Sequence, residues 1–261
     1  GPSEQMGFRP KVSVDDASIV LETVIEKALE WQLPAWFVSI DLRKAFDRVE
    51  HSALFQALRE QDVPESYIHV LRALYEGQSG TIEDQAQFPI LRGVRQGDVL
   101  SPLLFNAVLE SVMRRWKARL GLHGWSTTHD ENAERLSNLR YADDLILFAK
   151  SEAEACEMLG LLCDELKLAG LEMNGAKTKI MTTDEEYCAA GPPLLLETAA
   201  GFVEVLRGAG THKYLGKMLT GSLQHRGEAN LAHRISVGWF KFHGFKETFR
   251  NKKIPVGLRI K

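Results

Sequence analysis

The stretch LRYADDLILFA, residues 139–149, places two adjacent acids, Asp143 and Asp144, between short apolar runs. Both runs are rich in Leu, Ile, Phe and Tyr, which favours a strand on each side of an acidic turn. Side chains alternate along a strand, so adjacent acids share one direction only near a turn. Carboxylates between buried strands repel each other and lose solvation, and a divalent cation offsets that cost. A solvated Asp-Asp turn is the alternative.

A second candidate acid follows another apolar run. Residues 35–40 (AWFVSI) favour a buried strand, and Asp41 stands at its carboxyl end. An acid in this position can face a cleft, although a helix N-cap or plain turn is the alternative. If the two acidic strands are neighbours in one antiparallel sheet, three carboxylates converge there. Such a set can hold two Mg²⁺ ions about 4 Å apart, the geometry used for phosphoryl transfer.

Composition narrows the class of protein. The 261 residues are 44% hydrophobic and 26% charged, which is ordinary for a folded soluble domain or a few small ones. No apolar run approaches the length of about 20 residues that crosses a bilayer, so we expect no membrane partner and no signal peptide. Three cysteines without a close pair favour a reducing intracellular compartment, nucleus or cytoplasm, and argue against zinc. Gly1-Pro2 resembles a scar left by tag removal.

Charge is unevenly distributed along the chain. Residues 207–261 hold twelve of the 32 Lys and Arg but only two of the 35 acids, which leaves 20 bases and 33 acids in residues 1–206. The C-terminal part is therefore +10 and the rest −13. A basic segment on an acidic body indicates contact with a polyanion, and a basic surface helix without a partner is the alternative.

The remaining pattern alternates helices with short strands. Helical spacing covers residues 14–31, 51–61 and 64–74, and Ser101-Pro102 reads as the N-cap and first turn of a helix to Leu120. Ser151 and Glu154 form a capping box for a helix ending at Ala169. Further predicted elements are hairpins at 77–89, 194–206 and 212–219, a strand after Lys177, and a long helix with an apolar stripe to Phe249. The pattern predicts an α+β fold.

Five segments in order resemble the palm motifs of reverse transcriptases: FVSIDLRKAFDRVEH, GVRQGDVLSPLLFNAVLE, LRYADDLILFA, GLEMNGAKTK and HKYLGKML. The likeness is strongest to non-LTR (LINE-type) retrotransposons, with group II intron maturases next. EQMGFRPKVSVDDA resembles a fingers motif of the family. The resemblance implies a right-hand polymerase palm, an antiparallel sheet packed on helices, with partial fingers and the start of a helical thumb.

The resemblance also implies boundaries within the chain. These are partial fingers at 3–33, palm at 34–48, a fingers and palm segment at 49–97, palm with primer grip at 98–220, and the first part of a thumb at 221–261. Family members carry further fingers and thumb residues, so we expect reduced activity from a chain without them. Template preference, host and oligomeric state are not indicated.

The implied chemistry is RNA-directed DNA synthesis, in which deoxynucleotides are added to a primer 3′-OH on an RNA or DNA template. Asp41, Asp143 and Asp144 match the catalytic carboxylates, with Asp41 and Asp143 as the direct ligands of both Mg²⁺ ions. The carbonyl of Leu42 is a further ligand, and Mn²⁺ can substitute. Lys177 matches a general acid for pyrophosphate, with Lys179 close enough to compete for the role.

Other roles follow from the same resemblance. Residues matched to dNTP binding are Arg9, Lys44, Ala45, Phe46, Gln96, Gly97 and Lys177. Phe46 matches the steric gate that excludes a ribose 2′-hydroxyl, with a plain core Phe as the alternative; a surface arginine is the alternative for Arg9. Residues matched to the primer end and primer grip are Tyr141, Tyr214, Leu215 and Gly216. Predicted contacts of the thumb with the nucleic-acid backbone are Arg226, Arg234, Lys241 and Lys246.

Two other functions remain open at this point. An RNA-dependent RNA polymerase has a similar palm, but it must admit the 2′-hydroxyl that Phe46 would exclude. A domesticated domain that only binds RNA or protein would have no need of clustered carboxylates.

Overall fold

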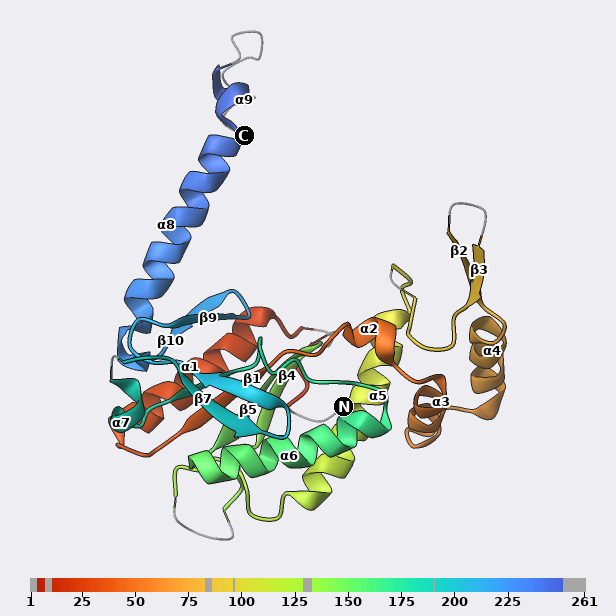
Figure 1. The fold of residues 1–261 in the computed structure, drawn as a ribbon, viewed down its shortest axis with the longest axis horizontal. Coiled ribbons are helices and arrows are strands. Elements are labelled where there is room, and N and C mark those ends of the chain that lie inside the picture. Colours follow the sequence, from red (N-terminus) through yellow and green to blue (C-terminus); the bar gives the residue numbers. More distant parts are fainter. Residues whose placement is uncertain are drawn as a thin grey trace.

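The computed structural model describes residues 4–7, 11–82, 86–95, 97–128, 133–189 and 191–250. Its centre is a six-stranded sheet in the order β4-β5-β1-β6-β8-β7 (Figure 1). Neighbouring strands are antiparallel except β6 and β8, which are parallel. The strands are β1 (Trp36–Ile40), β4 (Asn138–Tyr141), β5 (Asp144–Ala149), β6 (Lys179–Thr182), β7 (Leu194–Thr198) and β8 (Gly201–Val205).

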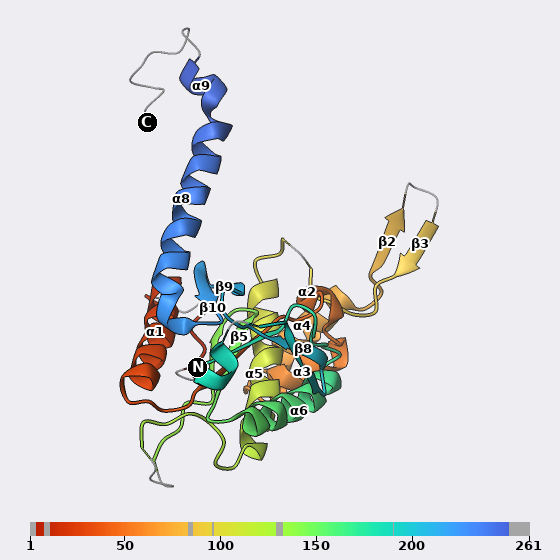
Figure 2. The same cartoon turned by 60° about the vertical axis from the view of Figure 1, so that its left-hand side comes forward.

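Helices cover both faces of this sheet. Helix α1 (Val14–Glu30) lies on one face, and α5 (Ser101–Arg119) and α6 (Glu152–Leu168) lie on the other (Figure 2). Strand β1 is buried along its whole length because Trp36 and Val38 pack toward α5 and α6 while Phe37 packs toward α1. A continuous apolar run is what a central strand covered on both faces requires.

The remaining elements surround the sheet, and α8 and the β2–β3 hairpin project from the body (Figure 1). No helix in the described ranges has the length and apolar character needed to cross a bilayer. The remaining elements are α2 (Ala45–Arg48), α3 (His51–Arg59), α4 (Glu65–Tyr75), β2 (Ser79–Ile82), β3 (Ala86–Pro89), α7 (Glu185–Cys188), β9 (Thr211–Tyr214), β10 (Lys217–Thr220), η1 (Leu223–His225), α8 (Arg226–Gly244) and α9 (Lys246–Arg250).

The α+β prediction is confirmed, but three local predictions are wrong. Leu100, not Ser101, is the N-cap of α5, and the Ser101 hydroxyl donates to the carbonyl of Arg95. Only half of the capping box of α6 forms, because the Glu154 carboxylate accepts the Gly124 N–H across the loop. The C-terminal helix is interrupted at Phe245, which separates α8 from α9.

An unpredicted strand-like segment, residues 4–7, extends the sheet beyond β4. The N–H of Met6 donates to the carbonyl of Arg140, and the N–H of Arg140 donates to the carbonyl of Glu4, both at 2.8 Å. Gly7 reaches the β4–β5 turn, where a Cβ would lie 2.3 Å from the backbone nitrogen of Ala142. The fingers motif and the acidic turn are therefore in direct contact, and only a glycine fits there.

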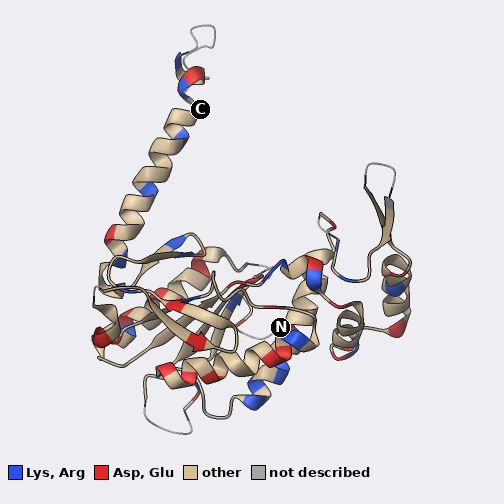
Figure 3. Cartoon of the chain, viewed as in Figure 1, with Lys and Arg blue, Asp and Glu red and all other residues tan. Residues whose placement is uncertain are grey.

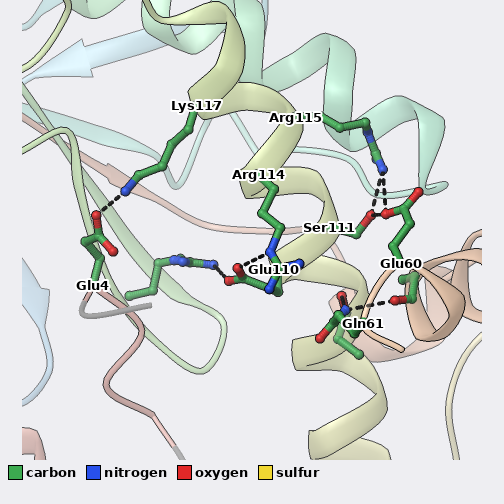
Figure 4. A network of polar contacts seen from close by, with 11 residues as sticks. Glu4, Glu60, Gln61, Glu110, Ser111, Arg114, Arg115 and Lys117 are labelled. Carbon is green, nitrogen blue, oxygen red and sulfur yellow. Dashed lines mark hydrogen bonds and ion pairs between the residues drawn. The ribbon is translucent and has the colours of Figure 1, made fainter. Parts of the chain in front are cut away.

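A charged network beneath β4 links this segment to α5 (Figure 4). Glu110 accepts a hydrogen bond from Arg114, and Lys117 is paired with Glu4. Glu110 also forms an ion pair of 3.1 Å with Arg140, whose side chain is 1% exposed. Burial lowers the pKa of Arg140, and the Glu110 carboxylate opposes that shift. The pair therefore stabilises a charge that the interior would otherwise disfavour.

We expect Glu110→Leu to destabilise the chain by about 3 kcal/mol, because it leaves the Arg140 guanidinium buried without its carboxylate. The double variant Glu110→Leu/Arg140→Met should recover most of this loss, since it removes both charges. Urea unfolding at neutral pH measures both. A single variant as stable as the parent would show that Arg140 does not depend on Glu110.

Candidate active site

The site is formed where β1 and β5 run antiparallel. Their register pairs Ile40 with Leu145, so Asp41 follows β1 beside Asp144 at the start of β5. On β5, Leu145 packs toward α5 and α6 whereas Ile146 packs toward α1. By alternation Asp144 lies on the α1 face, as Asp41 does two residues after Ser39. The predicted adjacency of the two acidic strands is confirmed.

Both carboxylates line a pocket of about 410 Å³ on that face. Lys177 Nζ lies 4.0 Å from Asp41 Oδ2. Lys179 Nζ instead bonds Glu204 Oε2 at 2.8 Å and the carbonyl of Ala176, so the geometry favours Lys177 for a role in the pocket. The lining residues are Ser39, Ile40, Asp41, Asp144, Ala176, Lys177, Lys179, His212 and Lys213.

The surroundings of Asp144 disfavour the charged form of its carboxyl group. Although its side chain is exposed at the rim, surrounding protein atoms partly desolvate it, and this raises its pKa to about 6, with the charges of Asp143 and Asp41 adding to the effect. Removing a carboxylate from water and placing two others nearby both favour the neutral acid. A cation in the pocket would relieve that repulsion.

Two carboxylates of the pocket, not three, are placed to bind a hard cation such as Mg²⁺. Among the described residues, no three His, Cys, Asp or Glu side chains lie close enough to hold a metal ion together. The pocket gathers Asp41 and Asp144, while Asp143 stands exposed in the two-residue turn between Tyr141 and Asp144. Mg²⁺ in proteins uses one or two carboxylates together with substrate phosphates, so this pair is a sufficient protein contribution.

The loop after β1 carries the residues predicted to meet a triphosphate. Leu42 pairs with Met173 in an isolated bridge. Lys44 has φ 46°, an unusual conformation for a non-glycine residue, and Ala45 opens α2. Phe46 is half-buried and stacks on Phe105 with ring centroids 4.9 Å apart. This stacking holds the Phe46 ring in one orientation.

The glycine loop before α5 is anchored at Gly93. Its N–H donates to the carbonyl of Val49, its φ is 93°, and a Cβ there would lie 2.8 Å from the Asp47 carbonyl oxygen. Gly97 is exposed, with φ 88°. The predicted residues Arg9 and Gln96 lie outside the described residues.

The segment matched to the primer grip forms the β9–β10 hairpin. Leu215 and Gly216 form its turn with φ values of 46° and 78°, and positive φ at both positions is the requirement of a type I′ hairpin. Tyr214 is 2% exposed, and burial raises the pKa of its hydroxyl, with Asp144 adding to the shift. Tyr141 ends β4 beside the acidic turn.

One predicted backbone contact is corrected by the structure. Arg226 is largely buried and forms ion pairs with Glu22 at 2.5 Å and Glu26 at 3.4 Å, so it joins α8 to α1. Arg234, Lys241 and Lys246 are exposed, and α8 is otherwise almost uncharged along its length (Figure 3).

Sequence reasoning missed three polar residues of the pocket, Ser39, His212 and Lys213. Ser39 Oγ lies 2.8 Å from His212 Nε2, which joins β1 to β9. Burial lowers the pKa of His212, Lys179 lowers it further, and Asp41 opposes both. The available signal was Ser39 itself, the one polar residue in the strand WFVSI.

The family of reverse transcriptases (RNA-dependent DNA polymerases) matches residues 1–219. The chain belongs to this family. The reverse transcriptase fold is also found among solved structures: apo telomerase from Candida tropicalis, truncated from its C-terminal domain, aligns with a TM-score of 0.54 at 16% identity over 84% of this chain and 40% of that chain.

Sequence relatives include proteins of retrotransposable elements and an intron protein. A retrovirus-related Pol polyprotein from the type-2 retrotransposable element R2DM of Drosophila melanogaster is 28% identical over 66% of this chain and 16% of its own length. A type-1 element R2 polyprotein of Popillia japonica is 32% identical over 62% of the chain and 23% of its own length. A putative COX1/OXI3 intron 1 protein of Saccharomyces cerevisiae is 26% identical over 58% of this chain and 22% of its own. The predicted resemblances to non-LTR retrotransposons and to group II intron proteins are both confirmed. The chain spans less than a quarter of the length of each of these three relatives.

We expect Asp144→Asn to raise the thermal unfolding midpoint at pH 8 in EDTA by about 2 °C, a small effect because the site is partly solvated. The pKa of Asp144 is raised from 3.8 to about 6 in the folded chain, so the ionised carboxylate weakens the folded state above that pH. The gain should shrink as pH falls through 6 and vanish near pH 4. Asp62→Asn, in an exposed turn, is the matched control. A gain independent of pH would contradict the repulsion.

Proposed function

We propose that this reverse transcriptase domain is the catalytic core of a retroelement RNA-directed DNA polymerase, which transfers dNMP from dNTP to a primer 3′-OH on an RNA or DNA template. The observation that carries the proposal is the pairing of Asp41 with Asp144 in one pocket, next to Lys177. Clustered carboxylates with a nearby ammonium suit phosphoryl transfer, in which an oxygen nucleophile attacks and pyrophosphate leaves.

The carboxylates of Asp41 and Asp144 in the pocket, with the carbonyl of Leu42, would hold Mg²⁺ or Mn²⁺. Asp143, exposed in the adjacent turn, would join them as the third carboxylate that the family resemblance implies. When bound, two such ions lower the pKa of the attacking hydroxyl and neutralise charge on the leaving group. The Lys177 ammonium donates a proton to the departing pyrophosphate oxygen.

Residues next to the carboxylates bind the triphosphate and select the sugar of the incoming nucleotide. Lys44 and the N–H of Ala45 bind the triphosphate, with Arg9, Gln96 and Gly97 completing the nucleotide site. Phe46, held by its stacking on Phe105, blocks a ribose 2′-hydroxyl by exclusion. A rigid ring discriminates better than a mobile one, because it cannot rotate away from the clash.

The primer and template occupy the same face. Tyr141 supports the primer end, and the β9–β10 turn, with Tyr214, Leu215 and Gly216, holds its backbone. Arg234, Lys241 and Lys246 on the projecting helices contact phosphates without reading sequence. We further propose that the domain works inside the cell, in keeping with three unpaired cysteines.

Primer extension on an RNA template with Mg²⁺ and dNTPs at low salt tests the proposal. We expect extension by the parent, and a rate lowered by about 10³-fold in Asp41→Asn, because a metal-binding carboxylate of the pocket is lost. Asp62→Asn should extend normally. With rNTPs in place of dNTPs we expect no extension, since Phe46 remains in place.

Two results would overturn the proposal. Extension with rNTPs as efficient as with dNTPs would indicate an RNA polymerase. Absence of extension by the parent on primed RNA, even within a longer chain, would favour a domain that only binds nucleic acid or protein.

A further inference from the structure

The buried hydroxyl of Ser39 raises a question that the polymerase chemistry does not answer. Every other residue of β1 is apolar, and Ser39 is 5% exposed. A buried hydroxyl costs free energy unless it is hydrogen-bonded. Its partner is His212 Nε2 at 2.8 Å, 173 residues away in sequence. The strand that precedes Asp41 is thereby connected to the hairpin matched to the primer grip.

Hydrogen bonds hold the β9–β10 hairpin from two sides. On β10, the Met218 N–H donates to Asn230 Oδ1 at 2.8 Å and the Met218 carbonyl accepts from Asn230 Nδ2 at 2.9 Å, which ties β10 to α8. On β9, the bond between His212 and Ser39 ties the hairpin to β1.

Within the described chain the strands of this hairpin pair only with each other, and neither belongs to the six-stranded sheet. Tyr214 and Leu219 bury apolar surface against the α1 face. Apolar packing is non-directional, so it holds the hairpin on that face without fixing its offset along β1. A hydrogen bond has directional geometry and can fix that offset.

Alternation along both strands makes this bond a geometric link within the pocket. His212 and Tyr214 are two residues apart on β9 and therefore lie on the same face of that strand. Ser39 on β1 and Asp41 just after β1 share a face for the same reason. The bond therefore lies two residues from the buried tyrosine on one side and two residues from the carboxylate on the other. Its loss would leave the turn at Leu215 and Gly216 held relative to Asp41 only by apolar packing and by the bonds between β10 and α8, neither of which ties β9 to β1.

We propose that His212 is a positioning residue, which sets the distance between the β9–β10 turn and Asp41 through its hydrogen bond to Ser39. The inference deepens the proposed function and rests on it: this bond aligns the primer 3′-OH with the catalytic carboxylates. It acts through Ser39 and the hairpin, not by touching the reacting atoms. A misplacement of about 1 Å can reduce a reaction rate by up to about 10²-fold.

Histidine variants separate this role from general stability. His212→Gln places an amide nitrogen near the position of Nε2 and should retain the bond, whereas His212→Asn is too short to reach Ser39. We expect kcat for primer extension to fall about tenfold in His212→Asn and in Ser39→Ala, with KM for dNTP unchanged, because alignment rather than nucleotide binding is lost. His212→Gln should retain near-parental kcat, as should His69→Asn, an exposed control on α4.

The double variant Ser39→Ala/His212→Asn should be no slower than either single variant, because one bond is removed in all three. Additive losses, or His212→Gln as slow as His212→Asn, would overturn the inference.

Hydrogen–deuterium exchange provides a test that does not require polymerase activity. Amides of residues 211–220 should exchange several-fold faster in His212→Asn and Ser39→Ala than in the parent, and at the parental rate in His212→Gln. Unchanged exchange in His212→Asn would overturn the inference. An inactive parent with faster exchange in His212→Asn would instead contradict the proposed polymerase function while supporting the link between β9 and β1.

Discussion

The antiparallel register between β1 and β5 is the constraint on which the site depends. Pairing Ile40 with Leu145 sets Asp41 beside Asp144 and directs both carboxylates to the α1 face. A slip of either strand by one residue would turn its acid toward α5 and α6, into the apolar core. The buried strand pattern on either side resists such a slip, because every residue of β1 and all but the first of β5 are buried. The register that buries the apolar residues of β1 and β5 is therefore also the register that brings Asp41 and Asp144 together.

The structure carries unfavourable features around the pocket and stabilising ones beneath it. Asp144 is partly desolvated beside two other acids, and Lys44 and Ala142 adopt positive φ without being glycine. Strain of this kind collects at functional sites where the surroundings hold it in place. Below the β4–β5 hairpin, the buried Arg140 is paired with Glu110 on α5, and residues 4–7 bond to the β4 edge. These contacts hold the turn that presents the acids.

Most elements and the adjacency of the acidic strands could be predicted from the sequence, because apolar periodicity and turn residues are local signals. The parallel β6–β8 pairing and the edge segment at residues 4–7 could not, since both depend on long-range backbone contacts. Arg226 was misassigned because its positive charge is visible in the sequence, whereas its partners Glu22 and Glu26 lie 200 residues away. The Ser39–His212 bond was missed for the same reason, although a serine in an apolar strand was a usable signal.

Cation binding by the Asp41 and Asp144 pocket is the central claim, and thermal unfolding across a Mg²⁺ titration tests it most directly. A ligand that binds only the folded chain stabilises it by RT ln(1 + [L]/Kd), so the unfolding midpoint rises with the ligand concentration. The account predicts that Mg²⁺ raises the midpoint of the parent and of Asp62→Asn, and that Asp41→Asn loses this response. An equal rise in Asp41→Asn and the parent would contradict it, because the cation would then bind elsewhere.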